Sequence, residues 1–138
     1  MTVEKGQTLN GSEKVDRYRS IYYAGASGDF NPIHIDPEFG KMVGLGGSIL
    51  QGLCTLAFAA KVVTDWTGDP GRLKKIKCRF SAPVMMEDTI SIHGVVTDVQ
   101  ADRAKIDIKV VNQHGAEVLQ KVEAEVWCQT YTIDNMGP

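Results

Sequence analysis

The chain has 138 residues, of which 43% are hydrophobic and 23% are charged, and its formal net charge is −2 at pH 7. This length suits one domain with a real core, and the composition is that of an ordinary soluble globular protein, so we expect a single domain over residues 1–138. So small a net charge provides no general field for nucleic acid or an anionic membrane, and we expect neither as a partner.

The cysteines and the N-terminal residues indicate a reducing compartment. Cys54, Cys78 and Cys128 are odd in number, widely spaced and free of any CxxC pair, which predicts buried reduced thiols and no metal site. The first residues, MTVEKGQTLNGSEK, lack the apolar core of an export signal. The longest apolar run, residues 49–60, falls short of the roughly 20 residues needed to cross a bilayer. We therefore expect a cytoplasmic protein.

The first half of the chain predicts three helices separated by turns. After a polar start, Asp16 can cap a helix through about Ala26. Asp36 followed by Pro37 is typical of a cap and a first helical residue, and predicts a short helix that ends near Gly44. Residues 52 to about 65 are apolar on nearly every side, which predicts a helix enclosed by other structure.

The second half changes to a period of two. Apolar and charged residues alternate there, which is typical of half-buried strands, and predicts four antiparallel strands around residues 75–80, 90–96, 105–110 and 118–128. Short turns at residues 99–103 and 112–116 connect the later strands. A twisted sheet with one face against the apolar helix is an α+β domain.

The stretch SGDFNPIH, residues 27–34, combines turn formers with an aspartate and a histidine five residues apart. In an ordered loop, the carboxylate of Asp29 and the imidazole of His34 can hold a water molecule between them and exchange its protons near neutral pH. The structural alternative is that aspartate and asparagine bond their own backbone in turns, and that an isolated histidine is a structural residue.

A longer stretch around these residues resembles a known family. YAGASGDFNPIHIDPEFG, residues 23–40, closely resembles the signature of the MaoC-like, type 2 enoyl-CoA hydratase family, with its G-D-x-N-P-(aliphatic)-H core. The resemblance implies a hot dog fold, in which a curved antiparallel sheet wraps around a long central helix and two subunits join into one continuous sheet. A homodimer is therefore expected.

The resemblance also implies an activity, which is the reversible syn addition of water to trans-2-enoyl thioesters of CoA or acyl carrier protein, giving (3R)-hydroxyacyl thioesters in fatty acid metabolism. By the same resemblance, Asp29 is the base toward the catalytic water and His34 shares the proton relay to the α-carbon. The backbone N–H of Gly52 binds the thioester carbonyl, and Asn31 orders the loop. No cofactor and no metal are expected.

The glycine assignment agrees with physical chemistry, because a helix N-terminus offers unpaired N–H groups and glycine permits close approach. Several positions depart from the family pattern. Two of them, Gln51 and Ala60, put in doubt the hydrogen bonding around the substrate and the fit of the acyl chain, whereas two others, Ala26 and Gly40, remain small and are expected to be tolerated.

The evidence for a functional role is weaker for the remaining candidate residues. We expect His93 and His114 at the surface, and Lys74, Lys75, Lys77 and Arg79 on a solvated strand face, although coenzyme A phosphates would also suit such a cluster. Four side chains, expected mostly to pack the first-half helices but also able to line an acyl pocket, are Tyr18, Tyr22, Phe39 and Met42. Two alternative functions are an acyl thioesterase of the same fold and one subunit of a heterodimeric dehydratase.

Overall fold

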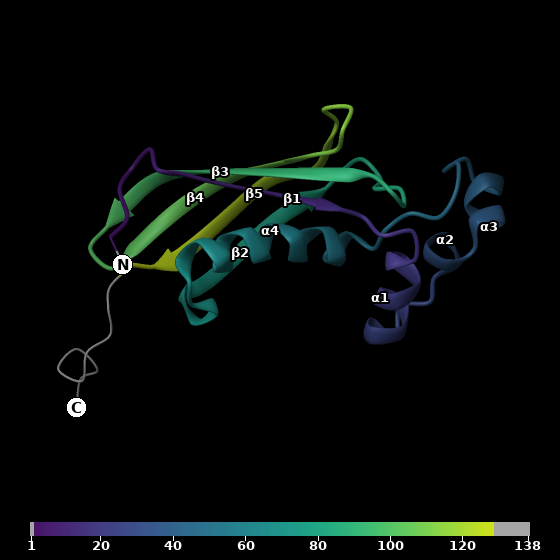
Figure 1. Ribbon diagram of the computed structural model, residues 1–138, viewed down its shortest axis with the longest axis horizontal. Helices are drawn as coiled ribbons and strands as arrows, with labels where there is room; N and C mark the ends of the chain where they lie inside the picture. The colour runs from purple at the N-terminus through teal and green to yellow at the C-terminus, as the bar shows by residue number, and fades with distance from the viewer. Residues whose placement is uncertain (1, 129–138) are drawn as a thin grey trace.

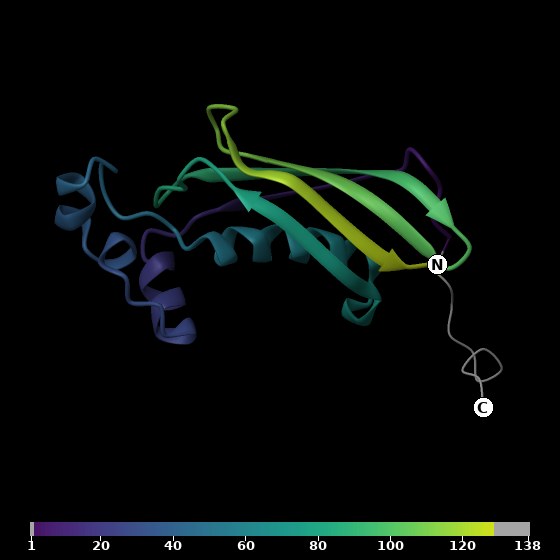
Figure 2. The same ribbon diagram turned by 180° about the vertical axis from the view of Figure 1, so that it is seen from behind.

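The computed structural model describes residues 2–128, so the predicted domain over residues 1–138 extends at both ends outside the described residues. Its centre is a five-stranded sheet in which every neighbouring pair is antiparallel (Figure 1). The strands stand in the order β1 (Thr8–Lys14), β3 (Thr89–Gln100), β4 (Arg103–Val111), β5 (Glu117–Trp127) and β2 (Leu73–Phe80). The two edges are therefore β1 and β2, and Figure 2 shows β2 beside β5 at one of them.

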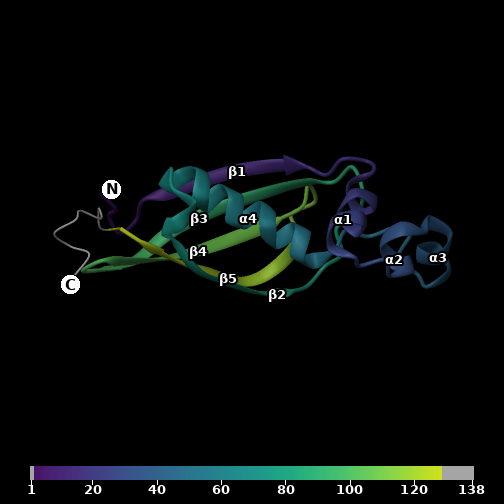
Figure 3. The same cartoon turned by 90° about the horizontal axis from the view of Figure 1, so that it is seen from below.

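The helix α4 (Gly52–Thr67) lies along one face of this sheet (Figure 3). Its buried side chains, among them Phe58 and Val63, pack against the inward residues of the strands. Those residues recur at every second position in β3 and β4, as a sheet with one covered face requires. Register shifts within three of the four strand pairs mark bulges, which bend the sheet around the helix. The α+β prediction and the hot dog fold are confirmed.

Three short helices lie beyond the N-terminal end of α4: α1 (Arg19–Ser27), α2 (Pro32–Ile35) and α3 (Pro37–Met42) (Figures 1 and 3). A single 3₁₀ turn, η1 (Pro70–Arg72), follows α4. As predicted, Asp36 caps α3, accepting from the N–H groups of Glu38 and Phe39 ahead of a proline at the first helical position. The predicted turns after β3 and β4 are also present.

Two element predictions were wrong. The sheet has a fifth strand, β1, which the polar start of the chain conceals because only Leu9 among its residues is buried. Asp16 does not cap the first helix, which begins at Arg19 after Tyr18 as its N-cap residue. The Asp16 carboxylate instead accepts from the Tyr18 N–H in the turn before the helix. An edge strand and a turn contain few buried apolar residues, so neither shows a clear hydrophobic periodicity in the sequence.

The burial of α4 and of the cysteines also differs from expectation. Leu53 is 62% exposed, so within one chain α4 is covered by the sheet on one side and open on the other. Cys54 is buried, whereas Cys78 and Cys128 are only half-buried, and all three are free thiols. Burial raises the pKa of the Cys54 thiol, and the nearby Arg19 guanidinium offsets part of this effect.

None of the helices in residues 2–128 is long and apolar enough to span a membrane.

Candidate active site

His34 lies on α2, a single helical turn, and not on the loop that the sequence predicted. The residue is buried, and its Nδ1 lies 2.9 Å from the carbonyl oxygen of Ile49. Because a carbonyl can only accept, this contact assigns the hydrogen to Nδ1. The other ring nitrogen, Nε2, is therefore the atom that remains for chemistry.

The chain that follows the end of α1 places Asp29 beside His34. Gly28 adopts a left-handed conformation (φ 79°) that ends α1 and turns the chain, as glycine does without steric cost. Asp29 Oδ2 then lies 3.6 Å from His34 Nε2, and Oδ1 accepts from the Asn31 N–H at 3.2 Å. A gap of 3.6 Å is too long for a direct hydrogen bond, but it allows both atoms to contact one water molecule.

Asn31 stands between the two and acts on the backbone. Its Oδ1 accepts from the Ile33 N–H at 3.2 Å, which caps the N-terminus of α2, and Pro32 occupies the first helical position. The motif thus uses its asparagine and proline to start the helical turn that carries His34.

Gly52 is the first residue of α4, and its N–H has no hydrogen-bond acceptor among residues 2–128. The N-terminal N–H groups of a helix have no intrahelical partner, so this donor is free for a ligand. A Cβ atom at this position would lie 2.7 Å from both Cδ1 and Cε1 of the Phe80 ring. The close approach of Phe80 is one physical reason for a glycine here.

These groups share one cavity of about 490 Å³. Asp29, His34 and Gly52 line it together with other polar residues, namely Ser27, Gln51, Thr55 and Ser81. Most of the rest of the lining is apolar, including Leu50, Leu53, Phe80, Val84, Val118 and Leu119. The volume is in the range of small-molecule sites, and an apolar wall with a few convergent polar groups suits an acyl chain with one reactive end. The arrangement can hold a carbonyl, a hydrocarbon chain and a water molecule together.

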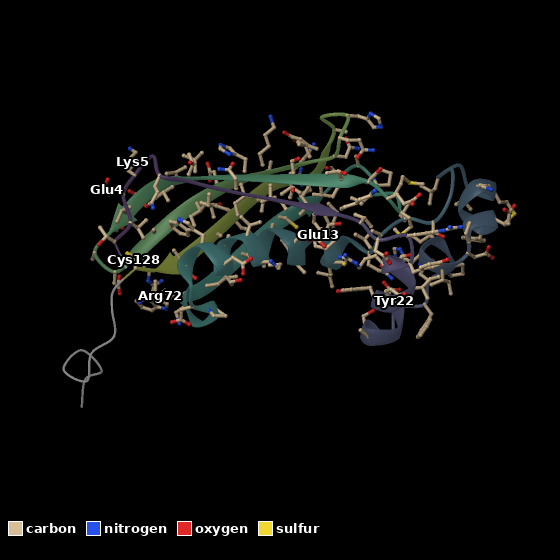
Figure 4. All side chains as sticks on the ribbon, in the orientation of Figure 1. Glu4, Lys5, Glu13, Tyr22, Arg72 and Cys128 are labelled. Atoms are coloured by element: carbon tan, nitrogen blue, oxygen red, sulfur yellow. The ribbon has the colours of Figure 1, made fainter. Side chains whose placement is uncertain are left out.

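The structure places the other histidines outside this cavity. His93 is exposed on β3, where its ring contacts Asn10 Oδ1, and His114 is exposed in the turn after β4, so the surface prediction for both is confirmed. The packing prediction was wrong for three of the four candidate side chains, because Tyr18, Tyr22 and Met42 are 48%, 64% and 75% exposed. Figure 4 shows Tyr22 on α1, away from the sheet. Phe39 is half-buried.

The basic cluster on β2 faces acidic residues of β5. Lys77 pairs with Glu123 at 3.2 Å, and Lys75 stands opposite Glu125 in the sheet register. This arrangement fits the solvated strand face that the sequence favoured. Among the described residues no group of three or more histidine, cysteine, aspartate or glutamate side chains could hold a metal ion.

Three features of the site escaped the sequence. The Ile49 carbonyl is a backbone group, so the order of side chains in the sequence does not indicate that it bonds to His34. The Phe80 ring reaches Gly52 from a strand far along the chain. Gln51, read only as a departure from the family, is buried and donates to the Ser20 carbonyl at 2.9 Å. Each of these contacts depends on tertiary packing.

The fold and the site together define a hot dog domain with an acid–base pair at the polar end of an apolar cavity. The sequence model of the MaoC like domain family matches residues 2–118, and the chain belongs to this family.

A named relative agrees with the assignment to this family. A probable enoyl-CoA hydratase 2 of Dictyostelium discoideum is 45% identical over 74 residues, which cover 52% of this chain and 25% of that relative. The chain therefore spans about a quarter of the length of this curated relative.

Two solved structures show the same fold. An (R)-hydratase from A. caviae involved in PHA biosynthesis superposes with a TM-score of 0.84 at 24% identity, covering 93% of this chain and 98% of that one. A chain of the ChsH1-ChsH2 complex from Mycobacterium tuberculosis gives a TM-score of 0.82 at 26% identity, covering 94% of this chain and 100% of that one.

Proposed function

We propose that this protein is an (R)-specific hydro-lyase, which reversibly hydrates trans-2-enoyl thioesters of CoA or acyl carrier protein to (3R)-hydroxyacyl thioesters. The observation that carries the proposal is the 3.6 Å spacing of Asp29 Oδ2 and His34 Nε2 in the cavity that Gly52 also lines. The family and the names of the similar proteins support it.

In this reaction one water molecule lies between Asp29 and His34. Its oxygen forms a bond to the β-carbon of the enoyl group while one of its protons passes to the pair. The electrons of the double bond move toward the thioester carbonyl, whose oxygen becomes negative. A proton then passes from the pair to the α-carbon, so the pair regains its starting state and water has been added across the double bond.

The fold restricts how His34 takes part. Its Nδ1 hydrogen is committed to the Ile49 carbonyl, so the ring gains and loses protons at Nε2 alone. Asp29 is the more exposed of the two, with 49% of its side chain accessible against 11% for His34. Asp29 acts as the base toward the water, and His34 shares the proton relay.

Gly52 provides the carbonyl partner. Negative charge develops on the thioester oxygen only as the β-carbon is attacked, so a donor held there in advance stabilises the transition state more than the substrate. A free N–H at the start of α4 supplies such a donor together with the positive end of the helix dipole.

The test is an assay of the purified protein on trans-2-enoyl-CoA substrates of graded chain length. We expect loss of the conjugated-enoyl absorbance, formation of the (3R)-hydroxyacyl product and no release of free CoA. Thiol release at the rate of enoyl loss would overturn the proposal in favour of a thioesterase. A parallel assay with acyl carrier protein thioesters separates the two carriers.

We propose further that the active form is a homodimer. Leu53 on α4 and Phe80 at the end of β2 are 62% and 55% exposed in the single chain, and both line the cavity. A second copy against this side would cover them and complete the wall of the site. The heterodimeric alternative is a chain that shows activity only with a partner, and the size of the active species in the same assay distinguishes the two.

A further inference from the structure

Gln51, the residue before Gly52, joins two elements that carry different parts of the site. Its side chain is 2% exposed, and its Nε2 donates to the carbonyl of Ser20 at 2.9 Å. Ser20 lies in the first turn of α1, the helix whose other end leads through Gly28 to Asp29. One buried hydrogen bond therefore ties the start of α4 to the helix that delivers Asp29.

Ile49, two residues earlier, holds the other member of the pair. Its carbonyl accepts from His34 Nδ1, and its N–H donates to the Ile33 carbonyl, both at 2.9 Å. The short segment of residues 49–52 thus bonds to the ring of His34 and to the helix before Asp29, and it also contains the free N–H of Gly52. The relative positions of all three groups depend on it.

Asp29 has little other support. Its side chain is 49% exposed, and apart from the contact with His34 its hydrogen bonds among residues 2–128 reach only Ser27 and Asn31, two residues away on either side. Local bonds move with the segment that contains them. These bonds join Asp29 to the start of α2, and α1, which ends at Ser27, fixes where the loop between them begins. The distance from Asp29 to His34 therefore also depends on where α1 lies.

The Gln51 carboxamide is not explained by packing. Its Oε1 is buried with no hydrogen-bond partner among the described residues, and such an unpaired group costs about 1–3 kcal/mol. A methionine has similar length and fills the same space without that cost. What the carboxamide adds is the N–H donated to Ser20.

We infer that Gln51 is a positioning residue, which holds α1 against the N-terminus of α4 and so sets the distance between Asp29 and His34. The kinetic consequence of this inference rests on the proposed hydratase function. Gln51 also lines the cavity, but the role inferred for it acts through the position of Asp29 and not through a contact with the substrate.

The first arm of the test compares Gln51→Met with the parent protein. Methionine removes the bond to Ser20 and also the unpaired oxygen, so the melting temperature should be equal or higher. A displaced base should lower kcat by about tenfold to a hundredfold, because small misplacements of catalytic groups are costly. KM should change by less than about threefold, and so should the Kd of butyryl-CoA, a saturated thioester that cannot be hydrated, since methionine keeps the length of the side chain and Gly52 and the other residues that line the cavity remain in place.

Two further variants separate positioning from stability. Gln51→His places a ring N–H where it can donate to the Ser20 carbonyl, so it should recover most of kcat. Val63→Ala removes a fully buried side chain from the same helix, far from Gln51, and should lower stability by roughly 0.5–1.5 kcal/mol or more. This control should keep the parent kcat.

A readout that does not depend on activity is the distance from Asp29 Oδ2 to His34 Nε2 in crystal structures of the parent and Gln51→Met, which should be longer in the variant. If the parent hydrates no enoyl thioester, the proposed function fails, and this distance still decides the inference. The inference is overturned if Gln51→Met keeps kcat within about threefold. It is also overturned if butyryl-CoA binding weakens while the distance is unchanged, because Gln51 would then contact the acyl group.

Discussion

Asp29 and His34 share one proposed water molecule, but the fold holds them differently. Asp29 is half-exposed at the end of a turn, whereas His34 is buried and bonded to Ile49. Substitutions of the two should therefore agree in their effect on chemistry and differ in their effect on stability. The sequence places both residues on one loop and gives no reason for this difference.

We predict that Asp29→Asn and His34→Ala each lower kcat by on the order of a hundredfold or more, as expected for lost acid–base catalysis. The double variant should be little worse, because both residues act on the same water. His34→Ala should also lower the free energy of unfolding by about 0.5–1.5 kcal/mol, since the Ile49 carbonyl loses its donor. Steady-state kinetics and urea unfolding measure these effects, and additive losses in kcat would contradict a shared water.

The contact between Gly52 and Phe80 decides how the proposed carbonyl donor can be tested. Any residue with a Cβ at position 52 meets the Phe80 ring at 2.7 Å, so a substitution of Gly52 alone mixes a clash with a change of donor. A Phe80→Ala background removes the clash. Gln51 has φ −60° and ψ 132°, a conformation that the residue before a proline readily adopts.

In that background, Gly52→Pro should lower kcat by roughly 10² to 10³ relative to Gly52→Ala, because proline removes the N–H and alanine keeps it. Proline is tolerated at the first helical position, so α4 should remain intact. Circular dichroism and the oligomeric state of the two variants must match. Equal kcat values would show that another group binds the carbonyl.

At the scale of elements, α3 and the glycine loop before α4 are in backbone contact. A Cβ atom on Gly40 would lie 1.9 Å from the carbonyl oxygen of Gly47, a distance that no side-chain movement relieves. The structure therefore goes further than the expectation that glycine is tolerated here, because this contact leaves no room for a Cβ. This contact fixes the loop that leads to Ile49, whose carbonyl orients His34.

We predict that Gly40→Ala destabilises the protein by about 1–3 kcal/mol, as overpacking does, and lowers kcat because the Ile49 carbonyl shifts. Gly25→Ala is the matched control. Gly25 lies in α1, has no neighbour within 4 Å of an added Cβ, and should gain about 0.5–1 kcal/mol from better helix propensity. Thermal unfolding of both glycine variants tests these predictions. If Gly40→Ala left the stability unchanged, the contact with Gly47 would be contradicted.

At the scale of the whole molecule, the open side of α4 supports the proposed homodimer. We predict a dimer at micromolar concentration, and we expect Leu53→Asp to weaken its association by at least a hundredfold, because a buried unpaired carboxylate is costly. His114→Asp adds the same charge at an exposed turn and should leave the dimer unchanged. Light scattering after size-exclusion chromatography measures both variants, and a fully active monomer would refute the proposal.

The sequence alone determined those features that depend on neighbouring residues. The cap at Asp36 and the alternation in β3 to β5 are local chemistry, so they are readable from residues close together in the chain. The motif at residues 27–34 pointed to the pair of Asp29 and His34 in the same way. From these and the resemblance, the hot dog fold and the candidate pair could be predicted.

Only the tertiary structure decided the rest. The edge strand β1 contains one buried residue, so its period is too weak to read. The hydrogen on His34 Nδ1 is assigned by a backbone carbonyl, and the bond from Gln51 joins residues 31 positions apart in the chain. The close approaches at Gly40 and Gly52 likewise depend on where distant backbone and side chains come to lie. Contacts of this kind arise from the packing of whole elements, and no local pattern in the amino-acid sequence records them.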